Sequence, residues 1–465
     1  MSLVAGIDSS TQSCKIEVRD AETGELVRSA SAPHPPTVPP RSEQDPGAWW
    51  QAMSSLLDQH AGDAAALSVA GQQHGLVVLG RDGRVLRPAK LWNDTESAPQ
   101  AQHLVDERGA AFWAEHTGSV PVASFTVTKL AWLREHEPDV FGRVQHVVLP
   151  HDWLTYRLTG ELVTDRGDAS GTGYWSPATG EYSTEILALV GLDASVAPRV
   201  LGPSTAAGTW GQVVVGPGTG DNMAAALGLG LGEGDVAISL GTSGTVFAVS
   251  NEPTADATGA VAGFADATGR FLPLVCTLNA TKVTDTVARL LGRSTAELDD
   301  AALQVAPGAG GVVMVPYLDG ERTPNLPNAT GVLTGLRSDT EAPQIARAAF
   351  EGVVCGLLDA LDALDRAGVA TRGGRLFLVG GGARSAAYQR IVADLTQRPV
   401  RIPPTGEHVA TGACVQAAAV LQSCRVDEVV AAWSTAADEV VDPDPTVDAA
   451  AVRAAYGTAA REHVR

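Results

Sequence analysis

Residues 4–18 read VAGIDSSTQSCKIEV, and this stretch decides the fold. An apolar run, a turn of small polar residues and an alternating run predict a β-hairpin whose first strand is buried. The pattern returns once, because residues 236–249 read VAISLGTSGTVFAV. The two turns, Ser9–Ser13 and Gly241–Gly244, align in register with Thr11 on Thr242. A repeat near half the chain length predicts an α/β protein of two related domains, each opening with this hairpin.

The length of the chain also favours two domains, since 465 residues exceed what one hydrophobic core usually supports. Residues 231–235, LGEGD, form a glycine-rich, charged break between the repeats and predict a hinge. We therefore predict domains at 1–234 and 235–465. Apolar residues at helical spacing predict helices over 345–364 and 448–464.

Charge and composition disfavour several classes of function. A formal charge of −20 without runs of lysine or arginine argues against binding to nucleic acid or to an anionic membrane surface. The first residues lack the basic start of a signal peptide, and no apolar run approaches the ~20 residues of a membrane span. We therefore expect a cytoplasmic protein without a membrane partner. The five cysteines contain no CxxC pair, so they predict neither a zinc site nor a disulfide framework.

The two turns are the best candidates for binding phosphate groups. A Walker A loop requires Gly-Lys, but the four lysines follow Cys, Ala, Thr and Thr, and the dinucleotide-like GEGDVA at 232–237 precedes its strand instead of following one. Small residues let phosphate oxygens approach backbone N–H groups and hydroxyls closely. The candidate ATP ligands are Ser10, Thr11, Gln12, Ser13 and Lys15 in the first hairpin, and Gly241, Thr242 and Ser243 in the second. Either turn alone would fit an ordinary hairpin equally well.

Two further features belong to the predicted phosphate site. Asp8 ends a buried strand beside the first turn, where a carboxylate is unfavourable unless it is hydrogen-bonded or faces a cation such as Mg²⁺. A strand at 376–379 is followed by Gly380–Ser385 and a helical run, an arrangement that suits a nucleotide. Its candidate ligands are Gly381, Gly382 and Arg384. The alternative is a tight strand-to-helix turn, which needs one glycine instead of three.

Asp221 is the candidate catalytic residue. It follows a strand at 213–215 and a glycine-rich turn, and it opens a helical run together with Asn222. A carboxylate at this junction can accept the proton of a substrate hydroxyl that attacks the γ-phosphate of ATP. The alternative role is that of a helix N-cap, which Asp commonly fills.

Neutral polar groups beside an apolar wall predict a sugar site in two segments that follow strand-like runs. The candidate substrate-binding residues are Gln73, His74, Trp92, Asn93 and Asp94, with Asn222 beside the base. His74 alone fits a structural histidine better than a ligand. Neither segment identifies the sugar.

Two long motifs resemble those of the FGGY family of carbohydrate kinases: SFTVTKLAWLREH at 124–136, and GVLTGL at 331–336 with QIARAAFE at 344–351. Within that family the chain is most similar to the xylulokinases, and the likeness runs from Val4 to about Val420. The segments that carry it include SEQDP at 42–46, LWND at 91–94 and GGGARS at 380–385.

The resemblance implies a two-domain, actin-like fold of the ribonuclease H type, with ATP and Mg²⁺ as cofactors. It places Asp221 on the family's general base, Asp8 on the aspartate at the metal, Gly241-Thr242 on the second phosphate loop and Gly381-Gly382 on the nucleotide-binding glycines. The expected reaction is transfer of the γ-phosphoryl group of Mg·ATP to a terminal hydroxyl of a ketopentose, O5 of D-xylulose. A small sugar and ATP are then the partners, and the family likeness also suggests a homodimer.

Three positions depart from the xylulokinase pattern. Gln73 stands in place of Met, Ser10 replaces a glycine, and Thr95-Glu96 replaces Gly-Arg. The first and third departures leave open a sister kinase for gluconate, ribulose or glycerol. An actin-like or chaperone-like ATPase would use the same phosphate loops without a sugar. A catalytically silent sugar sensor would be expected to lack Asp8 or Asp221, and both are present.

Overall fold

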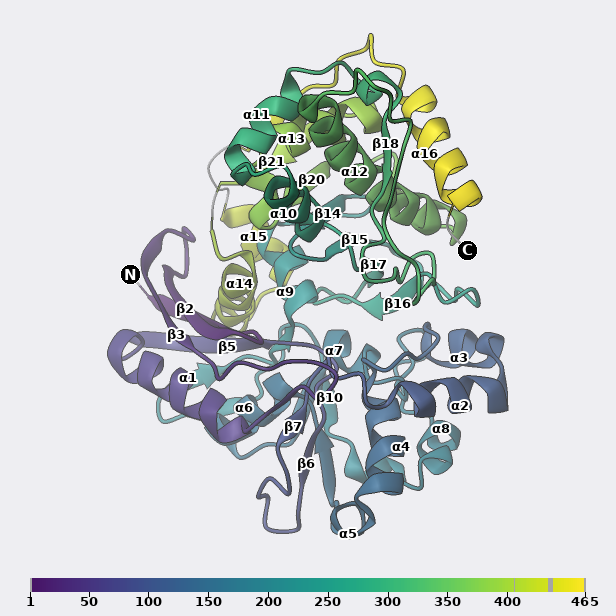
Figure 1. The fold of residues 1–465 in the computed structure, drawn as a ribbon. Coiled ribbons are helices and arrows are strands. Elements are labelled where there is room, and N and C mark those ends of the chain that lie inside the picture. The colour runs from purple at the N-terminus through teal and green to yellow at the C-terminus, as the bar shows by residue number, and fades with distance from the viewer. Residues whose placement is uncertain (1, 405, 434–437, 464–465) are drawn as a thin grey trace. The chain divides into compact units, whose positions relative to one another are not determined.

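The structure, a computed structural model, describes residues 2–404, 406–433 and 438–463, and its contacts divide the chain into two compact units (Figure 1). The first unit comprises 1–231, 251–272 and 406–435, and the second comprises 232–250, 273–405 and 436–465. The first break falls at Leu231, close to the boundary predicted after Gly234. The later segments 251–272 and 406–435 belong to the first unit, so the two units are not the continuous ranges 1–234 and 235–465 that were predicted.

The first unit is built on a mixed sheet with the strand order β11-β12-β5-β1-β2-β3. In that order the strands span Gly208–Trp210, Val213–Val215, Ala64–Gly71, Leu3–Ser9, Ser13–Asp20 and Leu26–Pro33. β1 runs antiparallel to β2, from the pair Leu3 and Asp20 to the pair Ser9 and Cys14, and parallel to β5. The hairpin predicted over 4–18 is therefore confirmed, and its turn lies at the carboxyl end of β1.

One face of this sheet holds the main core of the first unit. The helices on it are α1 (Pro46–His60) and α6 (Pro150–Thr159). Ile7 and Ile16 of the hairpin pack there with Trp49 and Trp153, whose rings meet edge to face at 6.3 Å. Because side chains alternate along a strand, Gly6 and Asp8 point to the opposite face.

The opposite face is covered by α14 (His408–Gln422), which packs against β1, β5 and α9 (Asp221–Gly228). The helix approaches at backbone distance, because the contact positions are glycines. A Cβ atom on Gly6 would lie 2.0 Å from the Ala410 carbonyl oxygen, and one on Gly412 would lie 2.0 Å from the Ala224 carbonyl oxygen. Asp8 and the start of α9 thus share the face that α14 covers.

Shorter elements complete the first unit. The remaining strands are β4 (Glu43–Gln44), β6 (Val77–Leu79), β7 (Ala89–Lys90), β8 (His146–Val148), β9 (Val163–Asp165), β10 (Arg199–Leu201), β13 (Thr219–Gly220) and β16 (Ala262–Ala265). The remaining helices are α2 (Ala98–Arg108), α3 (Ala110–Thr117), α4 (Thr126–His136), α5 (Pro138–Phe141), α7 (Arg166–Ser170), α8 (Thr184–Leu189) and α15 (Val426–Ala432).

The second unit is built on another seven-stranded sheet, whose strands from β17 onward follow the order β17-β15-β14-β20-β21-β22. In that order the strands span Phe271–Thr277, Gly244–Ala248, Val236–Leu240, Leu376–Val379, Val400–Ile402 and Glu439–Val441, and a separate pair is formed by β18 (Val313–Val315) and β19 (Val332–Thr334). The second predicted hairpin is confirmed, with Leu240 of β14 opposite Gly244 of β15.

The helices of the second unit are α10 (Thr281–Leu290), α11 (Thr295–Leu303), α12 (Ala342–Arg366), α13 (Ala386–Thr396) and α16 (Ala449–His463). The predicted helices over 345–364 and 448–464 correspond to α12 and α16. α12 begins earlier than predicted because Glu341 and Gln344 form a capping box around its start.

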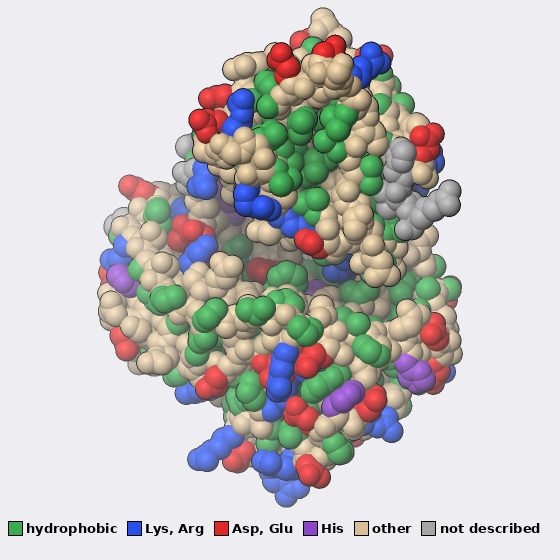
Figure 2. Space-filling model, in the orientation of Figure 1, with side chains coloured by type: hydrophobic (Ala, Val, Ile, Leu, Met, Phe, Trp, Pro, Cys, Tyr) green, Lys and Arg blue, Asp and Glu red, His purple; other side chains and the backbone are tan. Residues whose placement is uncertain are grey.

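Three features of the structure concern the membrane, the cysteines and the surface charge. No helix among the described residues has both the length and the apolar character to cross a membrane. The five cysteines form no disulfide among the described residues, and Cys14, Cys355 and Cys414 are buried. On the face drawn in Figure 2, lysine and arginine side chains are scattered among acidic ones and do not merge into a basic patch.

Candidate active site

The turn after β1 is held by hydrogen bonds from several segments. The backbone N–H and the hydroxyl of Ser10 both donate to the Ser13 carbonyl, at 3.0 Å each. The Thr11 carbonyl accepts from Gln44 Nε2 at 2.9 Å, and the Thr11 hydroxyl donates to Gln72 Oε1 at 3.1 Å. Gln12 at the tip is exposed. The turn is therefore pre-shaped, as a loop that binds phosphate needs to be.

Asp8 lies at the base of this turn and is 4% exposed. Its Oδ1 has no hydrogen-bond partner in the described part of the chain, while its Oδ2 lies 3.8 Å from Lys15 Nζ. Burial raises the pKa of Asp8 to about 6, although Lys15 opposes the shift. Lys15 itself contacts Glu407 Oε2 at 2.6 Å. A buried carboxylate with one unsatisfied oxygen is the kind of ligand that a divalent cation takes.

Asp221 is the first residue of α9, and Gly220 is the N-cap. The alternative role of Asp221 as the cap is therefore wrong, because its carboxylate makes no capping bond and instead accepts from the Asn222 backbone N–H at 2.8 Å. The side chain is partly accessible. Burial raises the pKa of Asp221 to about 7, and the negative charges of Asp8 and Asp168 add to the rise. A carboxyl group with this pKa can take up a proton near neutral pH.

Gln73 and His74 follow β5 and lie next to this carboxylate in the hydrogen-bond network. Asn222 Nδ2 donates to Gln73 Oε1 at 2.7 Å, and Gln73 is 3% exposed. His74 adopts a left-handed backbone with φ 64°, donates from Nδ1 to the Gly171 carbonyl at 2.7 Å, and stacks on Phe125 at 5.0 Å. The structure thus brings Gln73 and Asn222 beside the candidate base, whereas the His74 ring is held against Gly171 and Phe125.

Trp92 and Asn93 lie on the loop after β7. Trp92 is 42% exposed, and its Nε1–H donates to the Thr11 hydroxyl at 2.9 Å. The Asn93 Oδ1 is buried without a hydrogen-bond partner among the residues described. The indole is therefore connected to the turn after β1 by one hydrogen bond, and through Thr11 to Gln72.

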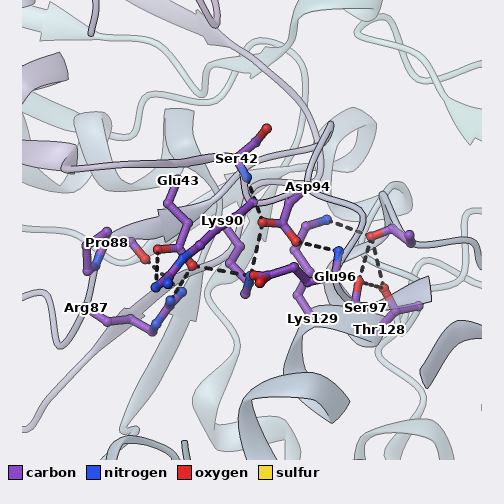
Figure 3. Close-up of polar contacts among 12 residues, drawn as sticks. Ser42, Glu43, Arg87, Pro88, Lys90, Asp94, Glu96, Ser97, Thr128 and Lys129 are labelled. Atoms are coloured by element: carbon purple, nitrogen blue, oxygen red, sulfur yellow. Dashed lines mark hydrogen bonds and ion pairs between the residues drawn. The ribbon is translucent and has the colours of Figure 1, made fainter. Parts of the chain in front are cut away.

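Asp94 differs from its two neighbours because it is fully buried. Figure 3 shows it with Lys90 and Glu96, and its Oδ2 accepts from Lys90 Nζ at 3.1 Å and from the Ser42 N–H at 2.9 Å. Glu43, Asp94 and Glu96 lie close enough to hold a metal ion, but the Lys90 ammonium lies among them. This geometry favours a supporting role for Asp94 over direct contact with a sugar.

The second unit contains a pocket of about 630 Å³ beside the second hairpin turn. Ligand pockets usually measure ~300–1,000 Å³. It is lined by residues of the turn, of α10 to α13 and of the loop after β20: Leu240, Gly241, Thr242, Thr281, Thr284, Asp285, Thr295, Ala296, Asp299, Phe350, Gly381, Gly382, Arg384, Ser385 and Tyr388. Leu240, Ala296 and Phe350 supply apolar surface in this lining. The pocket therefore combines an apolar wall with a helix N-terminus and hydroxyls, which suits a nucleotide.

The three glycines after β20 have different tasks. Gly380 has φ 86°, and a Cβ atom there would lie 2.6 Å from the Leu240 carbonyl oxygen. A Cβ atom on Gly382 would lie 2.8 Å from the Leu240 Cβ, whereas one on Gly381 would meet nothing within 4 Å. Two glycines thus permit close packing on β14, and the third leaves open space in the pocket.

Sequence reasoning missed much of this pocket. Asp285, Asp299 and Tyr388 lie on helices, and no local motif distinguishes them from ordinary helix residues. It also missed a buried histidine, His151, which lies among three aspartates of the first unit. The pair His151-Asp152 followed by Asp165 and Asp168 is the only sign of that cluster in the sequence.

Comparison with known proteins agrees with these features. The model described as FGGY family of carbohydrate kinases, N-terminal domain, matches residues 3–228, and the corresponding C-terminal domain model matches residues 236–421. A xylulose kinase of Streptomyces coelicolor is 53% identical over 453 residues, which cover 95% of this chain and 92% of the relative. A xylulose kinase of Streptomyces rubiginosus is 52% identical over 454 residues, with the same coverage of both chains. The crystal structure of a xylulose kinase from Bifidobacterium adolescentis superposes with a TM-score of 0.89 at 42% identity, covering 98% of this chain and 99% of that one.

Proposed function

This chain belongs to the FGGY family of carbohydrate kinases, and from that membership we propose that it transfers the γ-phosphoryl group of ATP to the terminal O5 hydroxyl of D-xylulose. The sugar is taken from the relatives, two of which are xylulose kinases that match nearly the whole chain. The observation that carries the chemistry is the position of the Asp221 carboxyl at the start of α9, hydrogen-bonded to Asn222, which in turn donates to Gln73. Burial raises the pKa of this carboxyl to about 7, which suits a base near neutral pH.

In the proposed reaction Asp221 acts as the general base. The sugar hydroxyl oxygen attacks the γ-phosphorus, its proton passes to a carboxylate oxygen of Asp221, and the bond to the β-phosphate oxygen breaks to release ADP. Gln73, His74, Trp92, Asn93 and Asn222 are proposed to bind the sugar. Their amides, imidazole and indole can hydrogen-bond sugar hydroxyls and cover an apolar face.

ATP is proposed to bind in the pocket of the second unit. Gly241, Thr242, Gly381, Gly382 and Arg384 line this pocket. The first turn, from Ser10 to Ser13, and Lys15 are proposed as phosphate ligands, and Ser243 as a further ligand in the second turn. A bound Mg²⁺ would neutralise charge on the phosphates, and the unsatisfied oxygen of Asp8 fits it.

One observation favours a second candidate. Gln73 puts a hydrogen-bonding amide where the xylulokinase pattern has a thioether, and that amide is bonded to Asn222 beside the base. A sister kinase that acts on ribulose, gluconate or glycerol would keep Asp8, Asp221 and both turns and differ only around Gln73-His74 and Trp92–Asp94.

The deciding experiment is a coupled ADP-release assay with D-xylulose, L-ribulose, gluconate, glycerol and no sugar. We expect the highest kcat/KM with D-xylulose and a rate near background without sugar. Preference for another sugar would assign the chain to a sister kinase, and a sugar-independent rate would instead support an ATPase. The matched control is Asp221→Asn, which should lower every sugar-dependent rate. A homodimer, suggested by the family likeness, is testable by sedimentation of the same preparation.

A further inference from the structure

His151 lies at the centre of a buried charge cluster in the first unit. It is on α6, and its side chain is fully buried. Its Nδ1 lies 2.6 Å from Asp168 Oδ2, and its Nε2 lies 3.2 Å from Asp152 Oδ1 and 3.9 Å from Asp165 Oδ1. Each ring nitrogen therefore faces at least one carboxylate.

The environment favours an imidazolium over a neutral ring. Burial alone lowers the pKa of His151, but the negative charges of Asp152, Asp168 and Asp165 overcome it and raise the value to about 9. Burial in turn raises the pKa of all three carboxyls, to about 7 at Asp152. The Tyr174 hydroxyl, whose own pKa is raised by burial and by Asp152 and Asp168, also belongs to this environment.

One set of contacts joins the cluster to His74, a predicted sugar-binding residue. The Asp168 carboxylate accepts a hydrogen bond from the backbone N–H of His74 as well as from the His151 ring. Gly171, just after α7, accepts from Nδ1 of the same His74 at 2.7 Å. The left-handed backbone of His74 is costly for a residue with a side chain, so it needs such bonds to persist.

A second set of contacts joins the cluster to the segment just before Asp221, the predicted base. Asp165 Oδ2 accepts from the Thr219 hydroxyl at 2.7 Å, and Thr219 precedes Asp221 by two residues. The His151 ring also packs under the turn before Asp221, since a Cβ atom on Gly218 would lie 2.4 Å from His151 Cδ2. A larger residue at position 218 would displace either the ring or the turn.

The energetics argue that this cluster serves more than stability. A buried cation among three carboxylates loses hydration that its ion pairs only partly restore, and apolar replacements of such clusters are often neutral or stabilising. The contacts instead join two backbone segments that are distant in sequence. We infer that His151 is a positioning residue of the kinase, which holds the His74 turn and the strand end bearing Asp221 in one fixed arrangement.

This inference rests on the proposed function, and it is tested with His151→Gln, which keeps hydrogen-bonding groups but cannot carry the charge. We expect kcat to fall about 10²-fold, since a displacement near 1 Å costs about that much. The KM for the sugar should rise about 3–10-fold, because the contacts that hold His74 are weakened. The KM for ATP should stay unchanged. The matched control is Arg347→Gln, which breaks a buried ion pair in the second unit, Arg347 Nε to Glu351 Oε1 at 2.6 Å.

A purely structural role would lower the melting temperature of His151→Gln and of Arg347→Gln alike and leave kcat per folded molecule unchanged in both, which would overturn the inference. Thr219→Val provides a second variant that loses only one hydroxyl. We expect it to lower kcat at least fivefold with little change in the KM for the sugar, because only the hydrogen bond between Thr219 and Asp165, near Asp221, is lost. If His151→Gln does not fold, an unchanged kcat in Thr219→Val overturns the proposal by itself.

A measurement without turnover separates this inference from the proposed reaction. Nitrogen-15 NMR of labelled histidines, assigned by the signal that His151→Gln removes or by selective labelling, reports whether both ring nitrogens carry hydrogen. We expect a doubly protonated His151 at pH 7.5 that loses its proton near pH 9, facing Asp152, Asp165, Asp168 and Tyr174. A neutral ring at pH 7.5 would refute the ion pairs between His151 and the three aspartates, whichever sugar the enzyme accepts.

Discussion

Replacement of Asp221 by Asn is expected to remove most turnover and yet stabilise the fold. The pKa of the Asp221 carboxyl is raised from 3.8 to about 7, first by burial and then by Asp8 and Asp168. Between these two values the folded protein holds the proton more tightly than the unfolded chain, so stability falls as the pH rises through this window. Asn is neutral at every pH and therefore lacks this penalty.

The size of the effect follows from the shift. About three pKa units at about 1.4 kcal/mol each give an upper bound of ~4 kcal/mol for the fully ionised carboxyl. The side chain is partly accessible, so solvent screening reduces the expected gain to about 1–2 kcal/mol. For a cooperative unit of this size that corresponds to a rise of roughly 2–4 °C in melting temperature, absent near pH 4 and largest at pH 8. Loss of the base should lower kcat by about 10²–10⁴.

The assay pairs thermal unfolding at pH 4 to 8 with ADP release at the same pH values where the protein is folded. In the wild type, kcat/KM should fall about tenfold for each pH unit below the Asp221 midpoint. The control is Asp193→Asn, because the hydroxyl of Ser195 lowers the pKa of that exposed carboxyl. Its replacement should give no gain in melting temperature at high pH. Near-wild-type kcat in Asp221→Asn would refute the assignment of the base, and a lower melting temperature at pH 8 would refute the electrostatic argument.

Four other outcomes are expected. Gly380→Ala should lower the melting temperature by several degrees, because this position has a positive φ and no room for a Cβ atom. Gly381→Ala should preserve stability and raise the KM for ATP. Equal melting temperatures of the two variants would contradict this. Lys90→Met leaves buried carboxylates unpaired and should cost about 3–5 kcal/mol in a denaturant titration, and an unchanged free energy of unfolding would contradict this. Trp92→Phe removes the bond to the Thr11 hydroxyl and should raise the KM for ATP about 3–10-fold, with unchanged values arguing against the connection. Chelation of divalent ions should abolish turnover, and added Mg²⁺ should restore it; activity in EDTA would exclude a metal requirement.

The parts of the fold that were predictable depend on short stretches of chain. The hairpins over 4–18 and 236–249 followed from a buried run, a polar turn and an alternating run, and both are present. The helix over 345–364 followed from its apolar spacing, although its start was missed because the capping pair lies before the apolar run. Local patterns decide such elements, so the sequence is sufficient for them.

The parts that were not predictable depend on distant segments. α14 was not expected to join the first unit, since a helix in the second half carries no mark of the sheet it covers. The alternative role of Asp221 as an N-cap failed because Gly220 fills that position. Asp94 was predicted from its place beside Trp92, but its burial against Lys90 is visible only in three dimensions. The residues chosen at the phosphate and sugar sites stay predictions until binding is measured.

The late position of α14 has a consequence for biosynthesis. A ribosome that has finished residue 231 has made the whole sheet of the first unit, but the helix that covers one face of β1 and β5 is still to come. At about 5–20 residues per second, the remaining roughly 200 residues to the end of that segment take ~10–40 s. Throughout that interval the face of β1 and β5 that contains Gly6 is exposed to chaperones and to other nascent chains. Expression of the first half alone should therefore yield aggregates, and supplying 406–435 in trans or by circular permutation should rescue it.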